Sequence, residues 1–320
     1  MPAPSSPNDY PIELPHPDIS AHAGGNCGIP YVYRFDAGRP GPHVMISALV
    51  HGNELCGAIV LDWLLAHQIR PQRGALSLAF VNTAAYDSFD PADPNASRYV
   101  DEDFNRLWSD EVLDSARDSV ELRRARELRP IMDTVDLLLD LHSMQHPALP
   151  LMMAGPCVKG RELAAQVGIP PTIVTDSGHA AGKRMRDYRA FADPSSPKNA
   201  LLAECGQHWA AQTGTTAFEC ALRFLRVTGT VAEDFGGDIG RTELPAAHAW
   251  EVTEAVTIAG EAFRFAQAFT GGEVIGRAGT LLGHDDDRPV LTPYDDCMLV
   301  MPSKRLTRGL TAVRLARRVG

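Results

Sequence analysis

The sequence lacks the features that mark secreted and membrane proteins. Its six cysteines stand singly with no CxxC pair, a pattern that favours reduced thiols over a disulfide framework. No apolar run approaches the roughly 20 residues that span a bilayer. The first 20 residues contain no basic segment followed by an apolar one, so they do not resemble a secretory signal. We therefore expect a soluble, cytoplasmic protein that does not act at a membrane.

Positive charge is also scarce. The chain has 30 Lys and Arg against 40 Asp and Glu, which gives a net charge of -10. Such a surface repels nucleic acids and anionic membranes, so neither is expected as a partner, and an acidic substrate would need a dedicated basic pocket. With 320 residues, 44% of them hydrophobic, the chain can form one large core and a smaller second one. The oligomeric state stays open, a homo-oligomer included.

Short apolar runs alternate with segments of helical periodicity from residue 31 onward. A strand, a helix and a strand in succession indicate a parallel crossover, and several such units predict a doubly wound α/β fold with a mixed sheet. The segment 110–134 is expected to be an amphipathic helix, interrupted near Pro130, whose charges face solvent. We expect strands at residues 31–35, 43–50, 76–82, 135–141, 149–154, 172–175 and 201–205, and further helices at residues 55–67, 160–167 and 216–227.

The pattern changes beyond Gly236. Short β-like pieces are separated there by Gly, Pro and Asp clusters, and helix-like residues occur only at 261–269. We expect strands at 250–258, 272–282, 290–292, 297–302 and 311–315. The sequence therefore predicts an irregular leader (1–30), an α/β catalytic domain (31–236) and a small β-rich C-terminal domain (237–320).

Two short motifs carry metal-binding chemistry. The motif HGNE, with His51 and Glu54, follows the apolar run 44–50, and the motif LDLH ends at His142. Imidazole and carboxylate ligands from rigid elements, with one coordination position left for water, are typical of catalytic zinc. Each residue also has a simpler interpretation, His51 or His142 as a hydrogen-bonded structural histidine and Glu54 as an acid favoured by a helix N-terminus. Together they predict a zinc hydrolase.

Two carboxylates accompany these motifs. Glu204 interrupts an apolar strand, where an unpaired carboxylate is costly to bury, and a water at the metal is the partner we expect. In an open parallel sheet, ligands bind at the carboxyl ends of the strands, where His51, His142 and Glu204 are all expected. Asp140 shares a strand face with His142, so it either orients that ring by a hydrogen bond or serves a helix-facing polar role.

The loop 98–106 mixes two arginines, an asparagine and several acids. Guanidinium groups bind carboxylates through paired hydrogen bonds, so Arg98 and Arg106 could form the basic pocket that an acidic substrate needs. The alternative is a cluster of surface salt bridges. Composition alone does not decide between the two.

The motifs HGNE, RYVDEDFNRLW, LDLH and LAECG, in this order, resemble the aspartoacylase and succinylglutamate desuccinylase family, relatives of the zinc carboxypeptidases. The resemblance covers most of residues 43–230 and implies a zinc-carboxypeptidase-like core. It also implies one zinc ion per chain, a general base and a small N-acyl amino acid as substrate. The residues implied are His51, Glu54 and His142 for the metal, Glu204 for the base, and Arg98, Asn105 and Arg106 for the substrate, although which arginine binds the amino-acid carboxylate stays open.

The reaction expected from this resemblance is amide hydrolysis, with Glu204 transferring the proton and Arg106 stabilising the oxyanion. The acyl group stays open because the chain departs from the named members after His142, where it reads SMQHP. Further substrate contacts are sought among Arg184, Arg186, Tyr188, Arg189 and Tyr294. Two alternatives remain, a zinc carboxypeptidase that acts on peptides and a non-catalytic, metal-stabilised binding module.

Overall fold

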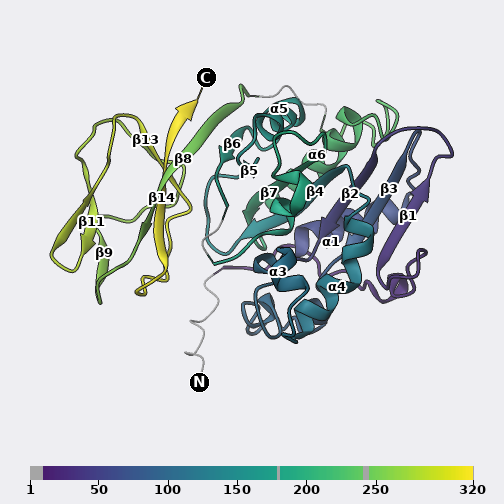
Figure 1. The fold of residues 1–320 in the computed structure, drawn as a ribbon, viewed down its shortest axis with the longest axis horizontal. Helices are drawn as coiled ribbons and strands as arrows, with labels where there is room; N and C mark the ends of the chain where they lie inside the picture. The colour runs from purple at the N-terminus through teal and green to yellow at the C-terminus, as the bar shows by residue number, and fades with distance from the viewer. Residues whose placement is uncertain (1–9, 179–180, 241–244, 320) are drawn as a thin grey trace.

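The computed structural model describes residues 10–178, 181–240 and 245–319 (Figure 1). Its strands are β1 (Val32–Asp36), β2 (His43–Ala48), β3 (Ala75–Phe80), β4 (Leu137–Met144), β5 (Leu151–Met153), β6 (Thr172–Thr175), β7 (Asn199–Gln207), β8 (His248–Thr257), β9 (Phe263–Phe265), β10 (Val274–Ile275), β11 (Leu281–Asp285), β12 (Arg288–Leu291), β13 (Cys297–Val300) and β14 (Thr311–Val319). Its α-helices are α1 (Leu55–Ala66), α2 (Thr83–Asp87), α3 (Asp110–Leu113), α4 (Val120–Met132), α5 (Val158–Val167) and α6 (Ala211–Val227). Short 3-10 turns include η2 (Ala96–Arg98), η3 (Phe104–Arg106), η4 (Met185–Asp187) and η5 (Arg189–Phe191).

One mixed sheet of eleven strands runs through the described residues, in the order β1-β3-β2-β4-β7-β5-β6-β8-β14-β13-β10. The strands β3, β2, β4 and β7 pair in parallel, as do β5, β6 and β8. The strands β1 and β5 pair antiparallel with β3 and β7, respectively. The predicted α/β fold with a mixed sheet is thereby confirmed.

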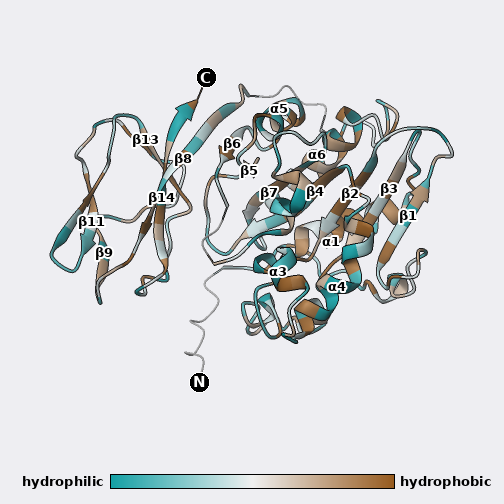
Figure 2. Cartoon of the chain, viewed as in Figure 1, coloured by the Kyte–Doolittle hydropathy of each residue, from teal (hydrophilic) through white to brown (hydrophobic). Residues whose placement is uncertain are grey.

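Helices cover both faces of this sheet, and the side chains of β2 pack against both sets of helices. Val44 and Ile46 pack into a core that contains apolar residues of α1, α5 and α6. Met45, between them, packs into a second core with residues of α3 and α4. Alternate side chains of a strand point to opposite faces, so a continuous apolar run is what a doubly covered strand needs. Figure 2 shows brown, apolar residues concentrated in these central strands, whereas α4 alternates brown and teal.

The predicted helix 110–134 is interrupted, but not at Pro130. The structure forms α3 and α4 with a break at residues 114–119, and α4 continues past Pro130 to Met132. A new helix begins after this break, with Ser119 as its N-cap residue. The Ser119 hydroxyl accepts a hydrogen bond from the Leu122 N–H at 3.0 Å. Pro130 lies in the last turn of α4, where its missing N–H removes only one hydrogen bond.

The C-terminal strands fall into two groups. The strands β8, β14, β13 and β10 extend the central sheet beyond β6, on the left of Figure 1, and β12, β11 and β9 form a separate antiparallel sheet. The helix expected at 261–269 was wrong, since this segment contains β9, which pairs with β11. Phe263 and Phe265 occupy strand positions because they pack into two small apolar clusters of this region. The C-terminal β-rich region is confirmed as a fold feature, and the division at residue 237 stays a prediction.

The predicted leader, 1–30, is described only from Tyr10 onward. Its described part contains one 3-10 turn, η1 (Ser20–His22), and joins the end of β7 through a hydrogen bond from the Glu13 N–H to the Trp209 carbonyl. No helix in the described ranges combines the length and the apolar character needed to cross a bilayer.

His43 at the start of β2 makes stability depend on pH. Its ring is buried, with Nδ1 3.0 Å from the Thr134 hydroxyl and Nε2 2.8 Å from the Ser77 hydroxyl. The Thr134 hydroxyl already donates to the Ile131 carbonyl, so it accepts from His43, and the Ser77 hydroxyl donates to Nε2. This arrangement suits a neutral ring. Burial lowers the pKa of His43, and the charge of Arg34 lowers it further.

The pKa of His43 is thus lower in the folded than in the unfolded chain, where it is about 6.5. The stabilisation is complete above the unfolded pKa and is lost as the pH falls through the folded pKa. We expect the free energy of unfolding of the wild type to fall more steeply below about pH 6.5 than that of His43→Gln. The difference in slope cannot exceed about 1.4 kcal/mol per pH unit. Urea denaturation at two pH values measures it, and identical slopes would contradict the prediction.

Candidate metal centre and its surroundings

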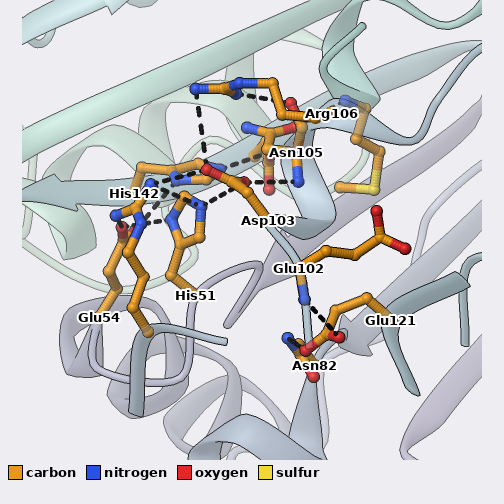
Figure 3. A network of polar contacts seen from close by, with 12 residues as sticks. His51, Glu54, Asn82, Glu102, Asp103, Asn105, Arg106, Glu121 and His142 are labelled. Atoms are coloured by element: carbon orange, nitrogen blue, oxygen red, sulfur yellow. Dashed lines mark hydrogen bonds and ion pairs between the residues drawn. The ribbon is translucent and has the colours of Figure 1, made fainter. Parts of the chain in front are cut away.

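Three buried side chains converge at the carboxyl ends of β2 and β4. His51 follows β2, Glu54 is the N-cap residue of α1, and His142 lies within β4 (Figure 3). One ligand atom from each lies within 4.8 Å of those of the other two. This is the one group of three or more potential ligands found among the described residues. The structure thus brings together the three residues predicted as metal ligands.

The turn that carries His51 and Glu54 depends on a glycine between them. A Cβ atom at Gly52 would lie 2.3 Å from the carbonyl carbon of Ala85 and 2.5 Å from the nitrogen of Tyr86, both in the backbone of α2. No larger residue fits without displacing α2. The Gly52 N–H also donates to the Arg98 carbonyl at 3.1 Å, which joins this turn to the loop 98–106. Close backbone packing therefore fixes where the first two ligands lie.

Glu54 bridges the two imidazole rings. Its Oε1 lies 2.6 Å from Nδ1 of His51, and its Oε2 lies 3.0 Å from Nδ1 of His142. Burial would raise the pKa of Glu54, but the charges of His51 and His142 outweigh burial and hold this pKa well below its ordinary value. The Ser143 N–H donates a further hydrogen bond to Oε2 at 3.0 Å. The Nδ1 atoms of both rings therefore face a carboxylate in its charged form.

A second pair of carboxylates holds the outer nitrogen of each ring. Asp140 Oδ2 lies 2.8 Å from Nε2 of His142, and the Ser47 hydroxyl donates to Oδ1 at 2.7 Å. Burial opposes protonation of His142, but Asp140 and Glu54 outweigh it and raise its pKa well above the ordinary value. The orienting hydrogen bond predicted for Asp140 is confirmed. Such contacts fix the tautomer and the orientation of a ligating histidine.

Asp103 is the corresponding partner of His51, and sequence reasoning missed it. Its Oδ1 lies 3.0 Å from Nε2 of His51. Burial would raise the pKa of Asp103, but His51, Arg98 and Arg106 outweigh it and lower the pKa far below its ordinary value. Since 52 residues separate Asp103 from His51, no spacing pattern connects them. The only signal was the charge-rich loop in which Asp103 lies.

Glu204 lies beside the triad on the neighbouring strand. The parallel register pairs it with His142, at the carboxyl end of β7. Its side chain is buried, and its Oε2 has no hydrogen-bond partner among the described residues. Burial raises the pKa of Glu204 to about 8, partly offset by the charge of His142. A buried carboxyl oxygen without a hydrogen-bond partner lowers the stability of the fold, so its position indicates a functional role for Glu204 rather than a structural one.

The predicted substrate residues lie around Asp103. Arg98 places Nη2 3.2 Å from Asp103 Oδ2 and 2.9 Å from Nε2 of His51. Arg106 Nη2 lies 3.7 Å from the same carboxylate, and its Nη1 donates to the Asn105 carbonyl at 2.7 Å. The Asn105 side-chain oxygen accepts a hydrogen bond from the Met185 N–H at 2.7 Å, which leaves its amide nitrogen available to contact a substrate. Figure 3 shows Asn105 and Arg106 next to Asp103, with a dashed line that joins Arg106 to the Asp103 carboxylate.

The further candidates from residues 176–199 are occupied by other contacts, with residues 179 and 180 outside the described ranges. Arg184 is paired with Asp176 and Asp187, and Arg186 donates to the Ala154 and Ala200 carbonyls. Tyr188 and Arg189 both donate to Asp133. Tyr294 instead contacts Thr253 and Arg317 of the C-terminal strands.

Arg314 of β14 was not anticipated from the sequence. Burial lowers the pKa of Arg106, and the positive charges of Arg98, Arg184 and Arg314 contribute to the same shift. Burial likewise lowers the pKa of Arg314. Its side chain forms no hydrogen bond or ion pair with any residue that the structure describes. A cation from the C-terminal strands therefore lies within electrostatic reach of the loop 98–106.

Known proteins share this fold. Succinylglutamate desuccinylase from Vibrio cholerae superposes with a TM-score of 0.67 at 17% identity, covering 91% of this chain and 86% of that one. A succinylglutamate desuccinylase/aspartoacylase from Rhodobacter sphaeroides gives a TM-score of 0.64 at 19% identity, covering 91% and 89%. Identities this low show the common fold alone.

Part of the chain has higher sequence identity to two curated enzymes. N-acyl-aromatic-L-amino acid amidohydrolases from Xenopus laevis and Rattus norvegicus are each 29% identical, over 113 and 116 residues. The chain matches only about a third of their length, 35% and 34%. The family model described as "Succinylglutamate desuccinylase/Aspartoacylase catalytic domain" matches residues 40–222, more than half of the chain, and includes the triad, the loop 98–106 and Glu204. The chain belongs to the succinylglutamate desuccinylase/aspartoacylase family.

Proposed function

We propose that this protein is a zinc-dependent hydrolase that cleaves the amide bond of an N-acyl amino acid. The observation that carries this proposal is the buried His51–Glu54–His142 triad with an unpartnered carboxyl oxygen of Glu204 on the adjacent strand. The family to which the chain belongs, and its similarity to amidohydrolases of frog and rat, support the same reaction class.

The donor set suits zinc. Two imidazoles and one carboxylate are a ligand combination of catalytic zinc sites, and Asp140 and Asp103 supply the outer contacts that such histidines need. We assign His51, Glu54 and His142 as ligands of one zinc ion per chain. When bound, zinc would lower the pKa of a water and polarise the acyl carbonyl. Its positive charge would also favour the ionised form of Glu204.

Glu204 would act as the general base. Its free Oε2 would accept a proton from the attacking water and return it to the leaving amine. Arg106 would stabilise the oxyanion that develops on the acyl group. Arg98 and the amide nitrogen of Asn105 would orient the substrate carboxylate, since guanidinium groups suit paired contacts with carboxylates. Asp103, shared by Arg98 and Arg106, holds both arginines in place for these roles.

Two alternatives can be separated from this proposal by substrate. A carboxypeptidase would share the metal site but would act on peptides. A non-catalytic binding module would hydrolyse neither peptides nor acyl-amino acids, and it would have no use for the buried, unpartnered oxygen of Glu204. The acyl group stays open, because the similar proteins include desuccinylases and N-acyl-aromatic amino acid amidohydrolases.

A substrate panel tests the proposal directly. We expect zinc-loaded protein to release free amino acid from at least one of the acetyl-, succinyl- and formyl-amino acids, because the proposed base and ligands are all present. Amine release by a fluorescent label, together with metal analysis of the same sample, measures it. Turnover of peptides with none of acyl-amino acids would favour the carboxypeptidase. Absence of both in protein with one zinc per chain would contradict a hydrolase.

Glu204→Gln tests the general base. The amide keeps the size of the side chain but cannot accept the proton, so kcat should fall by roughly 100- to 10,000-fold. Zinc content should stay near that of the wild type, because Glu204 is not among the assigned ligands. Loss of zinc together with activity would reassign Glu204 as a ligand, whereas unchanged kcat would exclude it as the base.

Asp140→Ala tests the outer contact of His142. Removing this hydrogen bond should weaken zinc binding by about 10- to 100-fold, because the ring loses the partner that orients it. Competition with a chromophoric chelator measures the affinity. Asp118→Asn is a suitable control, since Asp118 is an exposed residue paired with Arg123. Equal zinc affinity in Asp140→Ala and the control would show that Asp140 does not support the metal site.

A further inference from the structure

Glu121 in the first turn of α4 is a buried carboxylate without a cation. Its exposed fraction is 0%, and it forms no ion pair with any described residue. Its four contacts are all neutral N–H donors: the Asn82 side chain at 3.1 Å and the backbone of Val100, Asp101 and Glu102 at 2.7, 3.0 and 3.2 Å. Three successive amides thus point at one side chain. Figure 3 shows Glu121 next to Asn82, below the loop.

Side chains of the loop also form hydrogen bonds with the start of α4. The Asp101 carboxylate accepts a hydrogen bond from the Val120 N–H at 2.7 Å, and the Glu102 carboxylate accepts one from the Ser119 hydroxyl at 2.6 Å. The free N–H groups and positive dipole of a helix N-terminus favour carboxylates at this position. The loop and the first turn of α4 are therefore held together from both sides.

The segment held by Glu121 connects the residues that reach the triad. Arg98 precedes it, Asp103 follows it directly, and Arg106 lies in the 3-10 turn η3 just beyond. Arg98 and Asp103 both lie within 3.0 Å of Nε2 of His51. A displacement of residues 100–102 would move the arginines and Asp103 together. The candidate ligands lie after β2, at the start of α1 and within β4, so the displacement would reach them only indirectly, through the contacts of this loop with His51 and Gly52.

We propose that Glu121 is a positioning residue for substrate binding: it fixes the backbone of residues 100–102 so that Asp103 holds Arg98 toward the substrate carboxylate and Arg106 toward the acyl group. The inference rests on the proposed function. A carboxylate suits this task because it accepts from all four donors. A glutamine would present an amide N–H group to at least one backbone N–H. That contact is repulsive and would displace the loop.

The test uses the zinc-loaded, full-length Glu121→Gln variant. We expect one zinc per chain, a KM for the acyl-amino acid raised by about 10- to 100-fold and a smaller change in kcat, since misplacement of binding groups by about 1 Å has effects of this size. Glu127→Gln is the matched control, because Glu127 is an exposed glutamate of the same helix that pairs with Arg124. Its kinetic constants should equal those of the wild type.

A double-mutant cycle separates positioning from general destabilisation. If Glu121 acts through the loop, its effect on KM should largely disappear in an Arg98→Lys background, so the two effects are not additive. Additive effects, or an unchanged KM in Glu121→Gln, would overturn the proposal. If Glu121→Gln does not fold, Glu121→Asp replaces it, because aspartate keeps the carboxylate on a shorter side chain. We expect this variant to raise KM by less than Glu121→Gln would, and an unchanged KM would overturn the proposal.

The outcome for Glu121 is distinguishable from that of the proposed function. Failure of the wild type to hydrolyse any substrate refutes the hydrolase, and the inference is then judged from the Kd of acyl-amino acids measured by calorimetry. A Kd raised by about tenfold or more in Glu121→Gln supports positioning. Equal Kd values in the variant and the wild type, or no binding by either, overturn it.

Discussion

The parallel register of β2, β4 and β7 is the constraint on which the candidate site depends. Ala48 of β2 pairs with Leu141, and His142 pairs with Glu204, so the carboxyl ends of the three strands lie at one edge. Leu139 and Leu141 point into the core that contains α1 and α6, which leaves Asp140 and His142 on the other face. A slip of one residue would exchange these two sets of side chains. Core packing of the leucines therefore also orients His142, a candidate metal ligand.

The sequence predicted those parts of the site that depend on local patterns. His51 and Glu54 lie three residues apart after an apolar run, and His142 ends another, so strand ends and spacing were sufficient to find them. The contact between Asp103 and His51 joins residues 52 apart, and its position depends on how an irregular loop folds back. Periodicity says nothing about such loops. The same limit explains why Arg314, delivered by the last strand, was not anticipated.

Glu121 shows a different limit. The sequence predicted an amphipathic helix in this segment, and α4 has the apolar face that this requires, since Leu122, Ala125 and Leu128 are all buried. The same pattern placed the charged residues of this segment in solvent, which was wrong for Glu121. A helical pattern identifies the apolar face of a helix but does not indicate whether a neighbouring loop covers the polar face. Here residues 100–102 cover it, and their backbone N–H groups compensate the buried charge.

The distribution of charge is compatible with the acidic substrate that we propose for this acidic protein. The chain carries a net charge of -10, yet Arg106 lies near three further arginines, Arg98, Arg184 and Arg314, whose charges add to the effect of burial in lowering its pKa. Asp176 and Asp187 pair with Arg184, and Arg98 and Arg106 share the carboxylate of Asp103. Arg98 also lies 3.8 Å from Oε1 of Glu54. Arg106 therefore has only a share of one carboxylate as its ion-pair partner, and Arg314 has no ion-pair partner among the described residues. A carboxylate that enters would complete the pairing of arginines already held in position, so less ordering is required on binding.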